Sequence, residues 1–140
     1  MSFLYKGFKN GIKISFKIAP FILPLYIFVD FFKHTKLFLF IADFFKPAMK
    51  LMGLPGEAAI VLLSGFLINL YAAIGAMAPF NFTSKEITII GLVLGIAHNL
   101  IIESMILSKS GVKFYITVIF RIIIAIITGI GVNLIWNFIS

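Results

Sequence analysis

Cysteine is absent from this chain of 140 residues, and charged residues make up only 12% of it. The first absence excludes disulfides, zinc–thiolate centres and iron–sulfur clusters. The second departs from soluble domains, in which about 25% of residues are charged. The hydrophobic fraction is instead 61%, and so short a soluble chain cannot hide that much apolar surface from water. Lipid tails can cover such surface, so the composition predicts a single membrane domain over residues 1–140.

Acidic residues are also scarce, since five Asp and Glu stand against twelve Lys and Arg, for a net charge of +7. The cations lie at the ends of apolar runs, as in the cytoplasmic loops of membrane proteins, so they do not indicate a nucleic-acid partner. The basic N-terminus is followed by an apolar run without a small-residue cleavage site. We therefore expect this segment to be retained and not to act as a signal peptide.

The apolar runs predict an all-α, polytopic membrane helical bundle with four to five spans. Residues 2–14 mix lysines with apolar side chains, which favours an N-terminal interfacial helix, with a frayed basic tail as the alternative. The uncharged part of residues 37–53 is too short to cross a hydrocarbon core of about 30 Å. We therefore expect a broken or re-entrant helix near 37–56, and complete spans over residues 16–33, 57–80, 86–108 and 114–139.

The positions of the lysines predict the orientation. If the N-terminus is cytoplasmic and residues 37–53 cross the membrane, Lys33, Lys36 and Lys85 lie outside. Eight lysines then lie inside, which favours five crossings and a cytoplasmic N-terminus. If residues 37–53 only dip into the membrane, the parity changes. The eight are Lys6, Lys9, Lys13, Lys17, Lys46, Lys50, Lys109 and Lys113.

The densest polar group within an expected span is His98, Asn99, Glu103 and Ser104. Polar groups in a bilayer are costly, so this group predicts either a substrate or proton site or polar contacts that cement helix packing. On a continuous helix, His98 and Glu103 point about 140° apart, so we do not expect them to pair. Arg121 either pairs with Glu103 across two helices or extends its charge toward the headgroups, and the second option is favoured.

Two further polar residues are candidates for contact with a solute. Glu57 begins a helix after a Gly-Pro-Gly turn, where a ligand contact and an interfacial acid matched to the helix dipole are equally plausible. Asn69 lies in the middle of the helix expected over residues 57–80, where it can coordinate a substrate or a neighbouring carbonyl. No catalytic set or phosphate loop is present, so we expect no enzyme, no cofactor and no metal site.

The stretch GLPGEAAIVLLSGFLINLYAAIGAM, residues 53–77, resembles the Gate (nucleoside recognition) domain. It is similar to the first Gate region of bacterial B-type ferrous iron transporters, where a Gly-Leu-Pro-Gly turn precedes a Gly-Phe pair and a Cys-Asn pair. Gly65 and Phe66 match the Gly-Phe pair, and Asn69 matches the Asn of the Cys-Asn pair. Ile68 replaces the Cys, so the metal-ligating thiol that the resemblance implies is missing. The resemblance covers about residues 37–111.

Residues 97–111, AHNLIIESMILSKSG, resemble a second signature of small Gate proteins, which include the spore maturation A and B proteins. Concentrative nucleoside transporters resemble the chain more distantly, and Glu57 is similar to the Glu at their hairpin tip. These resemblances imply a transporter subunit of the bacterial inner membrane for a small polar solute that is nucleoside-like, an ion or a carboxylate. The site would comprise Glu57, Asn69, His98, Asn99 and Glu103.

A single copy has few spans for a transporter, so the sequence predicts a homo-oligomer or pairing with a sibling Gate protein. Small residues that let helices approach closely lie at Gly91 and Gly95, and at Ala72 and Ala76. The alternative function is a membrane scaffold or assembly partner that transports nothing.

Overall fold

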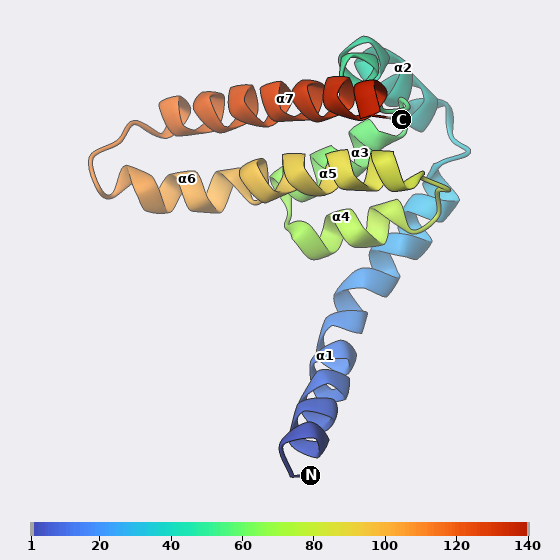
Figure 1. The fold of residues 1–140 in the computed structure, drawn as a ribbon, viewed down its shortest axis with the longest axis vertical. Coiled ribbons are helices and arrows are strands. Elements are labelled where there is room, and N and C mark those ends of the chain that lie inside the picture. The colour runs from blue at the N-terminus through green and yellow to red at the C-terminus, as the bar shows by residue number, and fades with distance from the viewer. Residues whose placement is uncertain (1, 140) are drawn as a thin grey trace.

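The computed structural model describes residues 2–139, and every regular element in this range is an α-helix (Figure 1). This confirms the all-α class and the membrane helical bundle. The two termini of the chain lie far apart, because α1 extends away from the other helices. The helices are α1 (Ser2–Phe32), α2 (Lys36–Leu51), α3 (Ala58–Leu67), α4 (Leu70–Met77), α5 (Ser84–Ala97), α6 (Leu100–Ser108) and α7 (Phe114–Ile139).

Two helical units within the described range are long and apolar enough to cross a membrane. One is α5 followed by α6, Ser84–Ser108, and the other is α7, which runs beside it in the opposite direction (Figure 1). Both match spans expected from the sequence. They form a pair connected by the short basic loop around Lys109 and Lys113.

Helix α1 adds a third span if its two halves, Phe3–Lys17 and Ile22–Phe32, cross together despite the 45° bend between them. Pro20 lies at this bend and Pro24 one turn later; each removes a backbone donor, which favours a kink. The expected interfacial helix and the first expected span are therefore two parts of one bent helix. The carbonyl oxygen of Ile22 would lie 2.8 Å from a Cβ at Gly75, so only glycine lets α4 approach α1 this closely.

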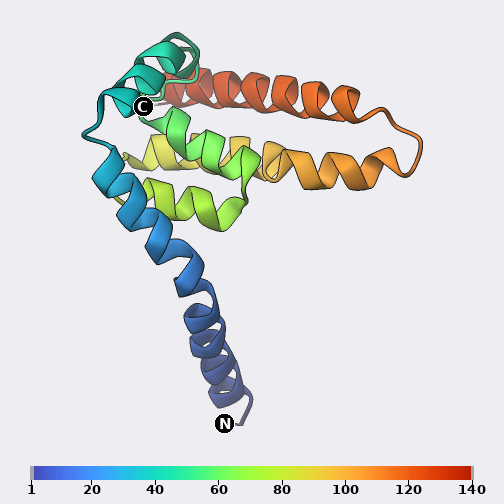
Figure 2. The same cartoon turned by 180° about the vertical axis from the view of Figure 1, so that it is seen from behind.

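Residues 57–80 do not form the single helix that the sequence predicted. Helix α3 ends at Leu67, and the chain turns back as α4, so that the two helices lie side by side in a hairpin (Figure 2). Asn69 produces the turn: its backbone is extended, and its side-chain Oδ1 accepts a hydrogen bond of 2.8 Å from the Ala72 amide. This is helix N-cap chemistry. At about 1.5 Å per residue, α3 reaches only halfway across a bilayer core.

Helix α2 is continuous from Lys36 to Leu51, with Pro47 inside it, so the helix is not broken near residues 37–56 as expected; the chain instead turns back between α3 and α4. It crosses the end of the bundle at which α7 ends (Figure 1). One of its faces is buried, a second exposes charges and a third exposes apolar side chains, which is typical of a helix at a membrane surface. The buried face contains Phe38, Ala42 and Met49. The charged face contains Asp43, Lys46 and Lys50, and the exposed apolar face contains Leu37, Phe40 and Phe44.

This arrangement changes the lysine count that supported a cytoplasmic N-terminus. Lys33 donates to the Pro79 carbonyl over 3.5 Å, and Lys85 donates to Asn137 Oδ1 over 2.6 Å. Both contacts lie at the end of the bundle that α2 covers. The α2 lysines, which that count placed on the opposite side, therefore share an end with Lys33 and Lys85. The orientation of the chain remains a prediction.

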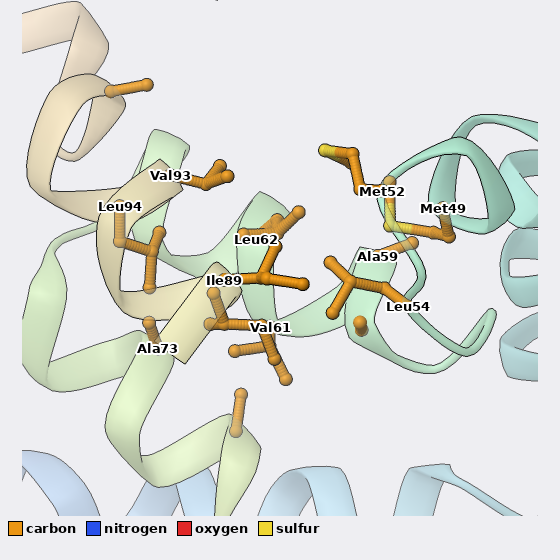
Figure 3. Close-up of a cluster of buried hydrophobic side chains, with 14 of the residues drawn as sticks. Met49, Met52, Leu54, Ala59, Val61, Leu62, Ala73, Ile89, Val93 and Leu94 are labelled. Atoms are coloured by element: carbon orange, nitrogen blue, oxygen red, sulfur yellow. The ribbon is translucent and has the colours of Figure 1, made fainter. Parts of the chain in front are cut away.

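The buried core connects the hairpin to the first half of the α5–α6 span (Figure 3). Side chains of α3, α4 and α5 interdigitate, and α2 with the following turn closes the cluster at one end. Burial of this apolar surface fixes the depth of the hairpin tip relative to α5, which in turn positions the polar residues described next. The labelled core residues are Met49, Met52, Leu54, Ala59, Val61, Leu62, Ala73, Ile89, Val93 and Leu94.

Candidate functional site

The span formed by α5 and α6 is broken near its middle, at His98 and Asn99. Asn99 adopts a left-handed backbone conformation with φ 52° and ψ 39°, the only positive φ of a non-glycine residue within 2–139. Asn tolerates this region better than most residues do, so the His-Asn pair can interrupt a helix at low cost. The break separates the last carbonyl groups of α5 from the first amides of α6, and both sets need other partners.

The hairpin tip and this break meet inside the bundle. The Asn99 amide donates a hydrogen bond of 2.9 Å to the carbonyl oxygen of Gly65, close to the end of α3. Gly65 is buried, and a Cβ there would collide with the Leu94 side chain. A glycine is therefore required for the hairpin to lie this close to α5. The end of α3 and the break between α5 and α6 thus lie next to each other inside the bundle.

His98 and Glu103 lie in contact across the break. The His98 Nε2 atom is 3.3 Å from Glu103 Oε1. The prediction that these side chains point apart is wrong, because it assumed a continuous helix. The left-handed backbone at Asn99 shifts the helical phase between the two residues, and the Glu103 carboxylate lies beside the imidazole ring.

Arg121 of α7 completes the cluster. Its Nη2 lies 2.6 Å from Glu103 Oε2, and its Nε donates to the Ile96 carbonyl over 2.8 Å. A longer bond of 3.3 Å reaches the His98 carbonyl. The prediction that Arg121 extends toward the headgroups is therefore wrong: it is the counter-ion of Glu103 and caps carbonyls freed by the helix break.

Three polar atoms in and beside this cluster are buried without a hydrogen-bond partner among the described residues: Asn99 Oδ1, Ser104 Oγ and Arg121 Nη1. Most buried polar atoms in folded proteins have a partner, and an unpaired one is costly in an apolar environment. The cluster is thus a polar group inside the bundle that retains unpaired hydrogen-bond donors and acceptors. His98 and Glu103 each remain about one third exposed, at 33% and 37% of the side chain.

The structure does not bring all five predicted site residues together. His98, Asn99 and Glu103 form the cluster, and Asn69 lies at the hairpin tip, although its Oδ1 is already used to cap α4. Glu57 is exposed at the opposite end of α3, and its side chain makes no capping hydrogen bond. It borders a shallow hollow formed by residues 80–83 and Glu86 at the end of the bundle.

A separate hollow of about 360 Å³ lies between α2, α3 and α7. Its walls are almost entirely apolar and include Phe45, Met52, Phe66 and Ile122. Hydrocarbon suits such walls better than a polar solute does. The hydrogen-bonded polar cluster therefore lies at the helix breaks and not in this hollow. Within residues 2–139, no group of three or more His, Cys, Asp or Glu side chains is placed to hold a metal ion.

Sequence reasoning missed the structural role of Gly65, and for Arg121 it favoured contact with the headgroups over the ion pair with Glu103. The signal for Arg121 was its position as the only cation inside the last span. The signal for Gly65 was the Gly-Phe motif that it forms with Phe66, but the motif did not indicate which residue Gly65 would contact. The partner, Asn99, becomes adjacent only because both helices are interrupted at the same depth.

Comparison with known proteins places this arrangement in a family. The family model described as "Gate: Nucleoside recognition" matches residues 15–135, which include every residue of the cluster. The chain belongs to the Gate family. This confirms the resemblance found in the sequence, and the match extends to both sides of the predicted residues 37–111. No solved structure matches the Gate chain.

Three relatives differ in how much of this Gate chain they cover. The membrane protein YvoD of Bacillus subtilis is 34% identical over 131 residues, which is 94% of the chain and 42% of YvoD. Protein MJ0880 of Methanocaldococcus jannaschii is 27% identical over 84% of the chain and 38% of its own length. Spore maturation protein B of B. subtilis is 33% identical over 41% of the chain. The chain thus spans about two fifths of the length of the first two relatives.

Proposed function

We propose that this Gate protein is a transporter subunit of a bacterial inner membrane and that it moves a small polar solute past the two helix breaks. The observation that carries the proposal is the hydrogen bond from the Asn99 amide to the Gly65 carbonyl, which joins the breaks at one depth. Interrupted helices that meet near the membrane midplane offer backbone and side-chain groups to polar solutes and ions.

The chemistry of the cluster favours a solute that both donates and accepts hydrogen bonds. Glu103 and His98 are partly exposed, and buried Asn99 Oδ1 and Arg121 Nη1 provide an unpaired acceptor and an unpaired donor. Hydroxyl and amide groups, as in a nucleoside, match this mixed set. A small carboxylate is the second candidate, since the unpaired Arg121 Nη1 can donate a charge-assisted hydrogen bond to it.

We further propose that transport requires a second Gate subunit, either a copy of this chain or a sibling. The chain covers only 42% of YvoD, so that relative has room for a second domain of similar size. Only 11% of the most apolar window of α7 is buried, which leaves a broad face for lipid or a partner. Gly91 and Gly95 are exposed and can admit a partner helix, whereas Ala72 and Ala76 are buried within the chain and cannot.

Uptake into proteoliposomes tests the transport proposal, with nucleosides and small carboxylates as solutes. Glu103→Gln and His98→Ala are expected to abolish uptake, because each removes a group of the cluster. Glu57→Gln is the matched control, since this carboxylate is exposed at the other end of α3, and it should retain uptake. Normal uptake by both cluster variants would exclude this site.

A second candidate function is a membrane scaffold that binds a protein partner and no solute. The match to spore maturation protein B, and the fact that Arg121, Glu103 and His98 contact one another within one chain, favour it. Thermal unfolding of the detergent-solubilised protein separates the two functions. A scaffold should show no stabilisation by any solute, whereas a transporter should be stabilised by its substrate in the wild type and not in Glu103→Gln.

A further inference from the structure

The imidazole of His98 is held at both nitrogens. Its Nδ1 lies 2.9 Å from the Leu94 carbonyl oxygen, and its Nε2 lies 3.3 Å from Glu103 Oε1. A carbonyl oxygen only accepts hydrogen bonds, so the short contact requires a hydrogen on Nδ1. The Leu94 carbonyl therefore fixes the tautomer of a neutral ring and leaves its Nε2 as a bare acceptor.

Without another proton, this bare nitrogen faces a carboxylate oxygen. An ionised carboxylate is also only an acceptor, so two lone pairs would oppose each other over 3.3 Å. In the other neutral tautomer the hydrogen lies on Nε2, so the bare Nδ1 faces the Leu94 carbonyl oxygen and that contact becomes repulsive instead. Both contacts become attractive when one extra proton lies on Nε2 or on the carboxyl group of Glu103.

We propose that His98 and Glu103 form a site for one proton, which closes the contact across the break between α5 and α6. The proton lies between Nε2 and Oε1, while Arg121 occupies the second carboxylate oxygen at 2.6 Å. With the proton bound, the cluster contains a cationic imidazole or a neutral carboxyl group beside a permanently charged guanidinium. The proton therefore adds one positive charge to a cluster that is otherwise neutral.

Few other charged side chains lie near this proton site. Arg121 is the only charged residue in α7, and α3 contains none. In α5 the charged residues are Lys85 and Glu86, which lie in the first turn, more than two turns before the break. In α6 the only other polar side chains are those of Ser104 and Ser108, which do not titrate. The pair thus lies in a neighbourhood with one fixed charge, that of Arg121.

Loss of the proton must weaken one of the two contacts of the ring. Leu94 belongs to α5 and Glu103 to α6, so His98 can then remain with only one side of the break. The hydrogen bond between Asn99 and Gly65 lies at the same break, and it connects the hairpin tip to this movement. Given the proposed transport function, the proton is the coupling ion, because its binding and release change the groups that meet the solute.

Nuclear magnetic resonance of the full-length protein, labelled with ¹⁵N-histidine and ¹³C-glutamate and free of solute, tests the proton site. Across a pH titration, His98 Nδ1 should stay protonated while the Nε2 signal and the Glu103 carboxyl signal change together, as coupled groups do. In Glu103→Gln the His98 signal should change over a different pH interval. His34, which is exposed at the end of α1, should be unaffected by that substitution and serves as the internal reference.

Two results would overturn the proton site: an Nε2-protonated tautomer of His98, or separate titrations of His98 and Glu103 in the wild type. If Glu103→Gln does not fold, Glu103→Asp keeps the charge but shortens the reach, and it should still lose the shared titration. These measurements need no solute. Failed uptake with an intact shared titration would therefore reject the transport function alone, and intact uptake with separate titrations would reject the proton site alone.

Discussion

Replacement of Arg121 by alanine tests whether this residue stabilises the helix break. The side chain is only 16% exposed, and it contributes one ion pair and two hydrogen bonds to carbonyl groups. Hydrogen bonds inside membrane proteins contribute about 0.6 kcal/mol on average and up to about 1.7 kcal/mol, and bonds to charged groups lie at the upper end. Three such contacts give an expected loss of about 3 kcal/mol, roughly a hundredfold in the folding equilibrium.

Reversible unfolding in mixed detergent micelles, followed by the fluorescence of the single tryptophan, measures this loss. Arg121→Lys should recover only part of it, because an ammonium group restores the charge but not the two-pronged geometry. Lys46→Ala is the matched control: this lysine is 70% exposed and lies 3.8 Å from Asp43, so its removal should cost less than about 0.5 kcal/mol.

A double-mutant cycle separates the ion pair from the carbonyl contacts. Arg121→Ala combined with Glu103→Gln should cost less than the sum of the single changes, by about 1–2 kcal/mol, because the lone carboxylate is no longer left without its partner. The reasoning is refuted if Arg121→Ala is as mild as Lys46→Ala, or if the two substitutions are strictly additive.

Three smaller changes and one control substitution, Gly131→Ala, probe the backbone that positions the cluster, each measured by the same unfolding assay. Gly53→Ala should destabilise by at least about 1–2 kcal/mol, since Gly53 has φ 70° and its Cβ would collide with Asn133; a Gly53→Ala protein as stable as wild type would contradict the observed turn. Gly75→Ala should force α4 away from α1, whereas Gly131→Ala, whose Cβ meets nothing within 4 Å, should be neutral or slightly stabilising. Thr83→Ala removes a capping box and should cost about 1 kcal/mol, and no loss would mean that α5 does not depend on this cap.

Local chemistry explains which helices were predictable. Thr83 and Glu86 form a capping box at the start of α5, just before the span expected over residues 86–108. The spans over α5–α6 and α7 follow from uninterrupted hydropathy. The break at Asn69 was not predicted, because Asn occurs both inside membrane helices and at N-caps, and its neighbours Ile68 and Leu70 are apolar in either case.

In the polar cluster, the residues were predictable from the sequence but their contacts were not. The sequence identified His98, Asn99 and Glu103 as costly groups in lipid, and it offered Arg121 as a counter-ion. It could not pair them, since helical periodicity placed His98 and Glu103 on different faces. The left-handed backbone at Asn99 removed that periodicity, and one residue of this kind changes the direction of every side chain after it.

The sequence by itself determined that this protein is an α-helical membrane protein, because composition and hydropathy act through the solvent and need no long-range contact. Its motifs at residues 53–77 and 97–111 further indicated the Gate family. Only the tertiary structure decided that α3 turns back halfway as a hairpin, that its tip meets the interrupted α5–α6 span, and that Arg121 joins His98 and Glu103 there. Those features depend on contacts between residues distant in the chain, whose geometry is set by packing and not by any local preference.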